Sequence, residues 1–187
     1  MKRRQVLWAT VLTTAWAQQP AAAQGERDVV ERLRRGGCAL MLRHAQTEPG
    51  IGDPPGYRLD QCATQRNLSA EGRAQAKRIG RWFADNRLSP QSVQSSAWCR
   101  CQDTAELAFG RFAVLGALSS SFDNPGVQDR QTQALRSRLK TISAGQFEVW
   151  VSHQVNISAM TGEGVVMGEG LLVSSKGALL GRLSFAN

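Results

Sequence analysis

The sequence predicts a three-layer α/β fold, in which helices cover both faces of a mostly parallel sheet. Short apolar or alternating segments, which are typical of strands, alternate along the chain with longer segments of helical periodicity. The chain has 187 residues, of which 42% are hydrophobic and 20% charged, and this fits one domain with a substantial core. Such a composition excludes a fibrous or disordered protein.

The N-terminal segment differs from the rest of the chain. A basic start at residues 2–4 precedes an apolar stretch over 6–17, and three alanines follow at 21–23. This order is typical of a secretory signal peptide, and the paired arginines resemble a twin-arginine export signal. We therefore expect a signal peptide over 1–23, a mature domain over 24–187 and a periplasmic location. A retained membrane anchor is the alternative.

The charge of the chain restricts its partners. Removal of residues 1–23 takes away three basic residues and no acidic one, so the formal net charge falls from +8 to +5. A basic surface attracts anionic partners by electrostatic steering. We expect no nucleic-acid partner, because no dense basic run is interleaved with aromatic residues. No second apolar segment is long enough to cross a bilayer, so stable membrane insertion is not expected after signal cleavage.

The first elements follow the N-terminal segment in order. A short helical pattern lies within residues 24–36, and the apolar run 38–42 after a Gly-Gly pair is typical of a buried strand. Residues 45–66 are rich in proline and glycine and predict a long loop, a kind of segment that is usually functional. Ser69 is the expected N-cap of a helix that runs to about Asn86.

The second half of the chain continues the alternation. Residues 147–151 alternate in polarity and predict a strand that ends at Ser152-His153. The other expected elements are a strand over 92–96, helices over 101–109 and 128–139, and a C-terminal hairpin of strands 170–174 and 178–185.

Four cysteines remain after the predicted cleavage: Cys38, Cys62, Cys99 and Cys101. In an oxidising compartment they permit up to two disulfides, with three full pairings. A zinc site is disfavoured, because the Cys-Arg-Cys spacing does not suit zinc and the chain has only two histidines. Cys38 lies in an apolar run and is a candidate for a buried free thiol. We favour pairing of Cys62 with either Cys99 or Cys101.

Three predicted strand ends carry residues suited to phosphate chemistry. Arg43 and His44 follow the first strand, Arg100 follows the second, and His153 follows the strand over 147–151. Ligands of open α/β sheets bind at this edge. An imidazole can act as a nucleophile at neutral pH, and two guanidinium groups can hold phosphate oxygens. The set predicts phosphoryl transfer that needs no metal and no cofactor.

Four short motifs in this order resemble a known family. They are Arg43-His44-Ala45 followed by Gln-Thr, a Leu-Ser-x-x-Gly-x-x-Gln-Ala helix start at 68–76, Ser-Ser-x-x-x-Arg at 95–100 followed by Thr-Ala, and Ser152-His153. Each is weak alone, but together they cover roughly residues 35–165. The chain is similar to the histidine phosphatase superfamily, which includes the phosphoglycerate mutases, acid phosphatases and phosphohistidine phosphatases.

The resemblance implies a phosphoglycerate mutase-like fold and a phosphatase with a phosphohistidine intermediate on His44. It implies His153 as the second catalytic residue and Arg43 and Arg100 as phosphate-binding residues. Within the superfamily the chain looks most like exported proteins near the lipopolysaccharide core heptose phosphatases. The expected substrate is therefore a phosphomonoester or phosphoramidate on a glycolipid or another exposed carrier. The chain is short for the family, so we expect an open site.

The proton donor to the leaving group is not evident from the sequence. One branch of the superfamily has an aspartate directly after the second histidine, where this chain has Gln154. We favour Asp123, and the alternatives are Glu48, Asp103 and Glu169. A good leaving group, such as that of a phosphoramidate, needs no donor.

Two other functions are alternatives to the phosphatase. A catalytically idle phosphate-binding or interaction protein would keep the pocket and lack the acid. A cysteine phosphatase is disfavoured, because only four residues separate Cys38 from Arg43, whereas that phosphate loop has five. A thiolate within an apolar strand is also unfavourable.

Overall fold

The computed structural model describes residues 21–185, so all but residues 21–23 of the predicted signal peptide lie outside it. The strands are β1 (Cys38–Arg43), β2 (Ser92–Ser95), β3 (Ala113–Val114), β4 (Phe147–Ser152), β5 (Glu169–Ser174) and β6 (Leu179–Ser184). The helices are α1 (Ala21–Arg35), α2 (Ala70–Asp85), α3 (Cys99–Phe109), α4 (Gln128–Leu139) and α5 (Gln154–Thr161). Within this part of the chain, no helix is both long and apolar enough to cross a membrane.

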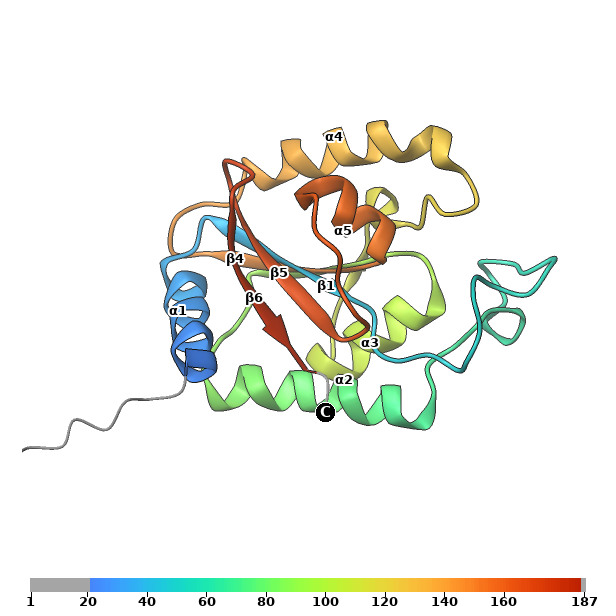
Figure 1. The fold of residues 1–187 in the computed structure, drawn as a ribbon, viewed down its shortest axis with the longest axis horizontal. Coiled ribbons are helices and arrows are strands. Elements are labelled where there is room, and N and C mark those ends of the chain that lie inside the picture. The colour runs from blue at the N-terminus through green and yellow to red at the C-terminus, as the bar shows by residue number, and fades with distance from the viewer. Residues whose placement is uncertain (1–20, 186–187) are drawn as a thin grey trace, which may run out of the picture.

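The sheet has six strands in the order β3-β2-β4-β1-β5-β6. The first four are mutually parallel, and β5 and β6 form the predicted antiparallel hairpin at the other edge. Helices lie on both faces of this sheet (Figure 1). The predicted three-layer α/β fold with a mostly parallel sheet is therefore confirmed.

Each face of the sheet has its own hydrophobic core. One core joins β1 side chains such as Leu40 and Leu42 to α1, α2 and α3. The other joins Met41 of β1 and Trp150 of β4 to α4 and α5. Because successive side chains of a strand point to opposite faces, the apolar run of β1 supplies both cores at once.

β4 departs from the pattern that its sequence suggests. Its alternation of polarity favours one exposed face, yet all of its residues are buried. The polar member, Glu148, is satisfied internally: its carboxylate pairs with Arg138 at 2.8 Å and accepts a hydrogen bond from Trp150 Nε1 at 2.6 Å. A buried carboxylate with such partners allows β4 to lie in the middle of the sheet.

The structure shows which cysteines are paired, and it differs from the sequence prediction at several element boundaries. Cys62 and Cys99 form a disulfide, while Cys38 and Cys101 are buried free thiols. The pairing of Cys62 with one of the two later cysteines is thus confirmed and resolved. Helix α3 begins two residues before its predicted start, and β3 and α5 were not predicted. Both are short, and α5 has almost no amphipathic periodicity.

Helix α2 is locked to the segment that follows His44. Ser69 caps the helix, as predicted, and accepts a hydrogen bond from Gly72 N at 3.0 Å. The Ser69 N–H donates to the carbonyl of Gln46 at 3.1 Å. A Cβ atom at Gly72 would lie 1.8 Å from the same carbonyl oxygen, so only glycine fits there. The helix-start motif therefore serves to place the loop after His44.

Candidate active site

The two histidines meet at the carboxyl ends of two central parallel strands. Arg43 of β1 is paired with Ser152 of β4, and the His44 N–H donates to the Ser152 carbonyl at 3.0 Å. This register brings His44 and His153, the next residues along each strand, side by side. Their ring centroids are 5.5 Å apart with an interplanar angle of 66°, and both residues are buried.

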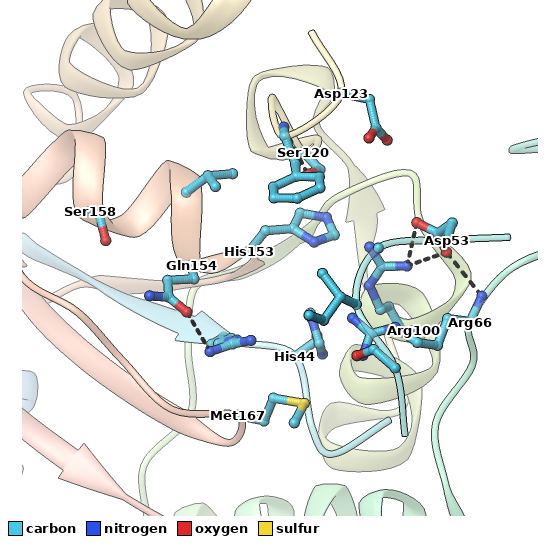
Figure 2. A pocket seen from close by; sticks show the side chains of 16 residues that line it. His44, Asp53, Arg66, Arg100, Ser120, Asp123, His153, Gln154, Ser158 and Met167 are labelled. Carbon is cyan, nitrogen blue, oxygen red and sulfur yellow. Dashed lines mark hydrogen bonds and ion pairs between the residues drawn. The ribbon is translucent and has the colours of Figure 1, made fainter. Parts of the chain in front are cut away.

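A cavity of about 450 Å³ lies over the two histidines. All four site residues predicted from the sequence line it: Arg43, His44, Arg100 and His153. Two residues that sequence reasoning missed, Asp53 and Arg66, also line it and come from the long loop over 45–66 (Figure 2). That loop extends away from the sheet, as the cyan and teal segment at the right of Figure 1 shows.

His44 has a defined tautomer. Its Nδ1 lies 2.8 Å from the carbonyl oxygen of Ala45, and a carbonyl can only accept, so Nδ1 carries the proton and Nε2 the lone pair. Burial lowers the pKa of His44 to about 3, with the positive charge of Arg100 acting in the same direction and the Ala45 hydrogen bond opposing them. The imidazole is therefore neutral at pH 7 and has a nucleophilic Nε2.

His153 is held by neutral partners. Its Nε2 lies 2.8 Å from Ser96 Oγ and 3.5 Å from Cys101 Sγ, and the Trp98 ring packs edge-on at 5.3 Å. Burial lowers the pKa of His153 well below its usual value, and the positive charges of the nearby arginines, and of His44 when it is protonated, add to this. A hydroxyl can donate or accept, so Ser96 suits both the neutral and the protonated ring. A bound phosphate would favour the protonated form.

Arg100 forms a buried ion pair inside the cavity. Its Nη1 donates to both carboxylate oxygens of Asp53, at 2.8 and 3.1 Å, and the two side chains are 5% and 2% exposed. Burial by itself raises the pKa of Asp53, but hydrogen bonds from Arg100, Arg66 N and Trp98 Nε1 outweigh it and lower the pKa. Asp53 is therefore ionised and fully bonded.

Arg43 is fixed from the other side of the cavity. Its Nη1 donates to Gln154 Oε1 at 2.7 Å and to the carbonyl of Val165 at 2.8 Å. Gln154 is the residue at the position where one family branch has an aspartate. In this chain that position holds an arginine in place instead of supplying an acid.

Three arginines offer unused donors around His44. The Nε atoms of Arg43, Arg66 and Arg100 are buried and have no hydrogen-bond partner among residues 21–185. The positive charges of all three lower the pKa of His44 or of its neighbour His153. Phosphate oxygens are well suited to accept from guanidinium groups. The one sequence signal for Arg66 was its place in a long loop, just before the helix-start motif.

Of the four candidate proton donors, only Asp123 lines the cavity. It is exposed and accepts a hydrogen bond from Tyr57 Oη at 3.1 Å, and Figure 2 shows it apart from His44 at the edge of the site. The other three candidates, Glu48, Asp103 and Glu169, lie outside the lining, and the last two pair with Arg73 and Arg182.

Lowering the pH from 7 to 5 is expected to reduce the free energy of unfolding. The pKa of His44 is about 3 in the folded protein and about 6.5 in an unfolded chain. The unfolded chain therefore binds more protons in this window, and stability that is present above pH 6.5 is lost as the pH falls. For His44 the loss is about 2 kcal/mol at pH 5. Urea unfolding at the two pH values measures it.

The control for this pH effect is His44→Gln, which removes the titrating ring and should lose less stability than the wild type over the same interval. Carboxylates contribute little between pH 7 and 5, because their pKa values in unfolded chains lie near 4. An equal pH dependence in wild type and variant would contradict a depressed pKa at His44.

Comparisons with known proteins agree with the fold. Residues 39–116 match the family model described as the histidine phosphatase superfamily (branch 1). The chain resembles SixA from Agrobacterium tumefaciens, assigned as a phosphohistidine phosphatase, at a TM-score of 0.56 and 20% identity, covering 79% of this chain and 98% of that one. No curated protein matches the sequence.

Two further solved structures hold phosphate-like oxyanions. One is the protein histidine phosphatase SixA complexed with tungstate, at a TM-score of 0.54 and 15% identity, covering 79% of this chain and 97% of that one. The other is a mycobacterial glucosyl-3-phosphoglycerate phosphatase complexed with VO3, at a TM-score of 0.52 and 17% identity, covering 73% and 92%. At these identities the likeness establishes a shared fold.

Proposed function

We propose that this chain is a member of the histidine phosphatase superfamily and a phosphatase that forms a phosphohistidine intermediate on His44. The observation that carries the proposal is the hydrogen bond from His44 Nδ1 to the Ala45 carbonyl. It leaves the Nε2 lone pair on a neutral ring, in a cavity lined by three arginines. A neutral nucleophile beside cationic groups suits attack on a phosphoryl group.

In the first step, His44 Nε2 forms a bond to phosphorus while the bond from phosphorus to the leaving group breaks. The ring then carries a positive charge, which the Ala45 carbonyl stabilises through Nδ1–H. Arg43, Arg66 and Arg100 offset the charge on the phosphoryl oxygens, and His153 donates to one of them when protonated. In the second step water attacks phosphorus, phosphate leaves, and His44 regains its lone pair.

The mouth of the cavity suits a leaving group larger than a small metabolite. Ile51 and Phe122 line it and are 92% and 56% exposed. Asp123 at the same mouth is the donor that we propose for an ester leaving group. A phosphoramidate would need no donor. We propose a phosphate on a glycolipid, such as a lipopolysaccharide core heptose, or on another exposed carrier, reached in the periplasm after cleavage of residues 1–23.

A catalytically idle phosphate-binding protein is the second candidate. It is favoured by one observation: Asp123 is exposed, accepts a hydrogen bond from Tyr57 and lies at the edge of the site. Such a protein would bind oxyanions through the same arginines and would not release phosphate. The two candidates therefore differ in turnover and not in binding.

Turnover and the covalent intermediate distinguish these functions. Purified protein should hydrolyse an aryl phosphate, and tungstate should inhibit this competitively. Quenching turnover in alkaline detergent should trap a phosphoryl group on the protein, and later acidification should release it, as expected of a phosphoramidate, whose bond is stable in base and labile in acid. A panel of phosphohistidine peptides and lipid-linked sugar phosphates then tests the substrate class. Tungstate binding without hydrolysis of any of these compounds would support the idle protein.

A further inference from the structure

Two acidic residues line the cavity together with its three arginines: Asp123 is exposed, whereas the side chain of Asp53 is buried. Asp53 lines the cavity with Arg43, Arg66 and Arg100, and its side chain is 2% exposed. A negative charge there weakens the attraction of the site for phosphate. We therefore looked for a contribution of the Asp53 carboxylate to phosphate binding that offsets this weaker attraction.

The bonding of Asp53 excludes a role in proton transfer. One oxygen, Oδ1, accepts from Arg100 Nη1 at 2.8 Å and from Arg66 N at 2.9 Å. The other, Oδ2, accepts from Arg100 Nη1 at 3.1 Å and from Trp98 Nε1 at 3.0 Å. Four donor contacts fill the acceptor sites of a carboxylate, so no lone pair is left for a substrate proton.

The same contacts orient Arg100. Asp53 engages only Nη1, and no hydrogen bond among residues 21–185 uses the Nε of Arg100, which is buried. The carboxylate thus fixes one corner of the guanidinium group and leaves the remaining donors for an anion. Because the guanidinium group of Arg100 is already held in one orientation, it loses little conformational entropy when it binds an oxyanion.

Asp53 also holds Arg66, which comes from the other end of the same loop. The Arg66 N–H bonds to Asp53, and Arg66 Nη1 donates to the carbonyl of Gly50 at 2.6 Å. The closed loop is tied to the start of α3 by the Cys62–Cys99 disulfide and by a hydrogen bond from Cys99 N to Gln65 Oε1 at 3.0 Å. Both of these bonds involve Cys99, and Arg100 is the next residue along the chain.

We infer that Asp53 is a positioning residue, which orients the Arg100 guanidinium toward the phosphate and holds the backbone of Arg66 beside it, and that the Cys62–Cys99 disulfide keeps its loop docked on α3. The inference rests on the proposed phosphate site but not on turnover. Its probe is therefore tungstate, a tetrahedral oxyanion, whose binding can be measured whether or not the protein is a phosphatase.

The test compares Asp53→Asn with Asp60→Asn. Asp60 is an exposed aspartate of the same loop, paired only with Arg58 at 3.0 Å in the described residues. We expect Asp53→Asn to raise the Kd for tungstate and the KM for an aryl phosphate about tenfold or more, with a smaller change in kcat. Asp60→Asn should leave all three unchanged. Calorimetry and steady-state kinetics supply the values.

Two results of this comparison would overturn the inference. An unchanged tungstate Kd in Asp53→Asn, even with a lower melting temperature, would show that Asp53 only stabilises the fold. A lower Kd would show that its charge mainly repels the anion. If the wild type binds tungstate but hydrolyses nothing, the phosphatase proposal fails while the role of Asp53 is still decided.

If Asp53→Asn does not fold, reduction of the Cys62–Cys99 disulfide in the wild-type protein provides a second test. Cys62 is exposed, so a reductant can open the disulfide of the wild type without removing any contact of Asp53. Reduction should raise the tungstate Kd, and Cys62→Ser should show the raised Kd with no further response to reductant. An identical Kd in the oxidised and reduced wild type would overturn the role of the disulfide.

Discussion

Replacing His44 by alanine is expected to lower kcat/KM for an aryl phosphate by at least about four orders of magnitude. The variant has no ring nitrogen to accept the phosphoryl group, so water would have to attack the substrate directly. Because the cavity also contains three arginines, the variant should still bind tungstate with a Kd within a few-fold of the wild type. Steady-state kinetics and calorimetry measure these two quantities.

Retained tungstate binding is the control for this variant, since it shows that the arginines are in place. Unlike the wild type, His44→Ala should also trap no phosphoryl group when turnover is quenched in alkaline detergent. Hydrolysis that continues at more than a small fraction of the wild-type rate would reject His44 as the nucleophile. Loss of both hydrolysis and binding would indicate a collapsed site.

Replacing Arg100 by alanine is expected to have two separable effects. Loss of a donor to the transferring phosphoryl group should lower kcat/KM by about 100- to 1,000-fold. Loss of the cation also leaves Asp53 as an unpaired charge whose side chain is 2% exposed, which should cost about 3–5 kcal/mol of stability. Kinetics and urea unfolding at pH 7 measure the two effects.

Two variants control for Arg100→Ala. Arg73 pairs with Asp103 at 3.2 Å on the surface, with side chains 51% and 36% exposed, so Arg73→Ala should change stability by no more than about 1 kcal/mol and leave activity intact. The double variant Asp53→Asn with Arg100→Ala should regain part of the lost stability without regaining activity. If it recovered activity as well, the loss in Arg100→Ala would be due to unfolding.

The fold and the central site residues could be predicted because they follow from local patterns. Apolar runs bounded by glycine mark the strands, and a polar residue directly after a parallel strand lies at the ligand-binding edge. This reasoning placed His44 and His153 together, and the pairing of β1 with β4 explains why it worked. It also placed Arg43 and Arg100 in the same cavity.

The remaining site residues depend on tertiary contacts of a long loop. Asp53 and Arg66 are 13 positions apart and meet only because the loop closes on itself and docks on α3. No periodicity reports such contacts, since the loop has almost no regular structure. Glu148 illustrates the same limit in the core: its partner Arg138 lies on α4, so the sequence of β4 alone does not show that this carboxylate is paired.

Cys101 affects how inhibitor experiments on this protein should be interpreted. Its sulfur lies 3.5 Å from His153 Nε2, close enough for a bulky adduct to block the site. Burial, however, raises the pKa of this thiol to about 12, which outweighs the opposing charge of Arg100. Almost no thiolate exists at neutral pH, so iodoacetamide should neither label Cys101 in the native protein nor slow hydrolysis. Resistance to alkylation is therefore the expected chemical profile of this cavity, although it contains a cysteine beside a histidine.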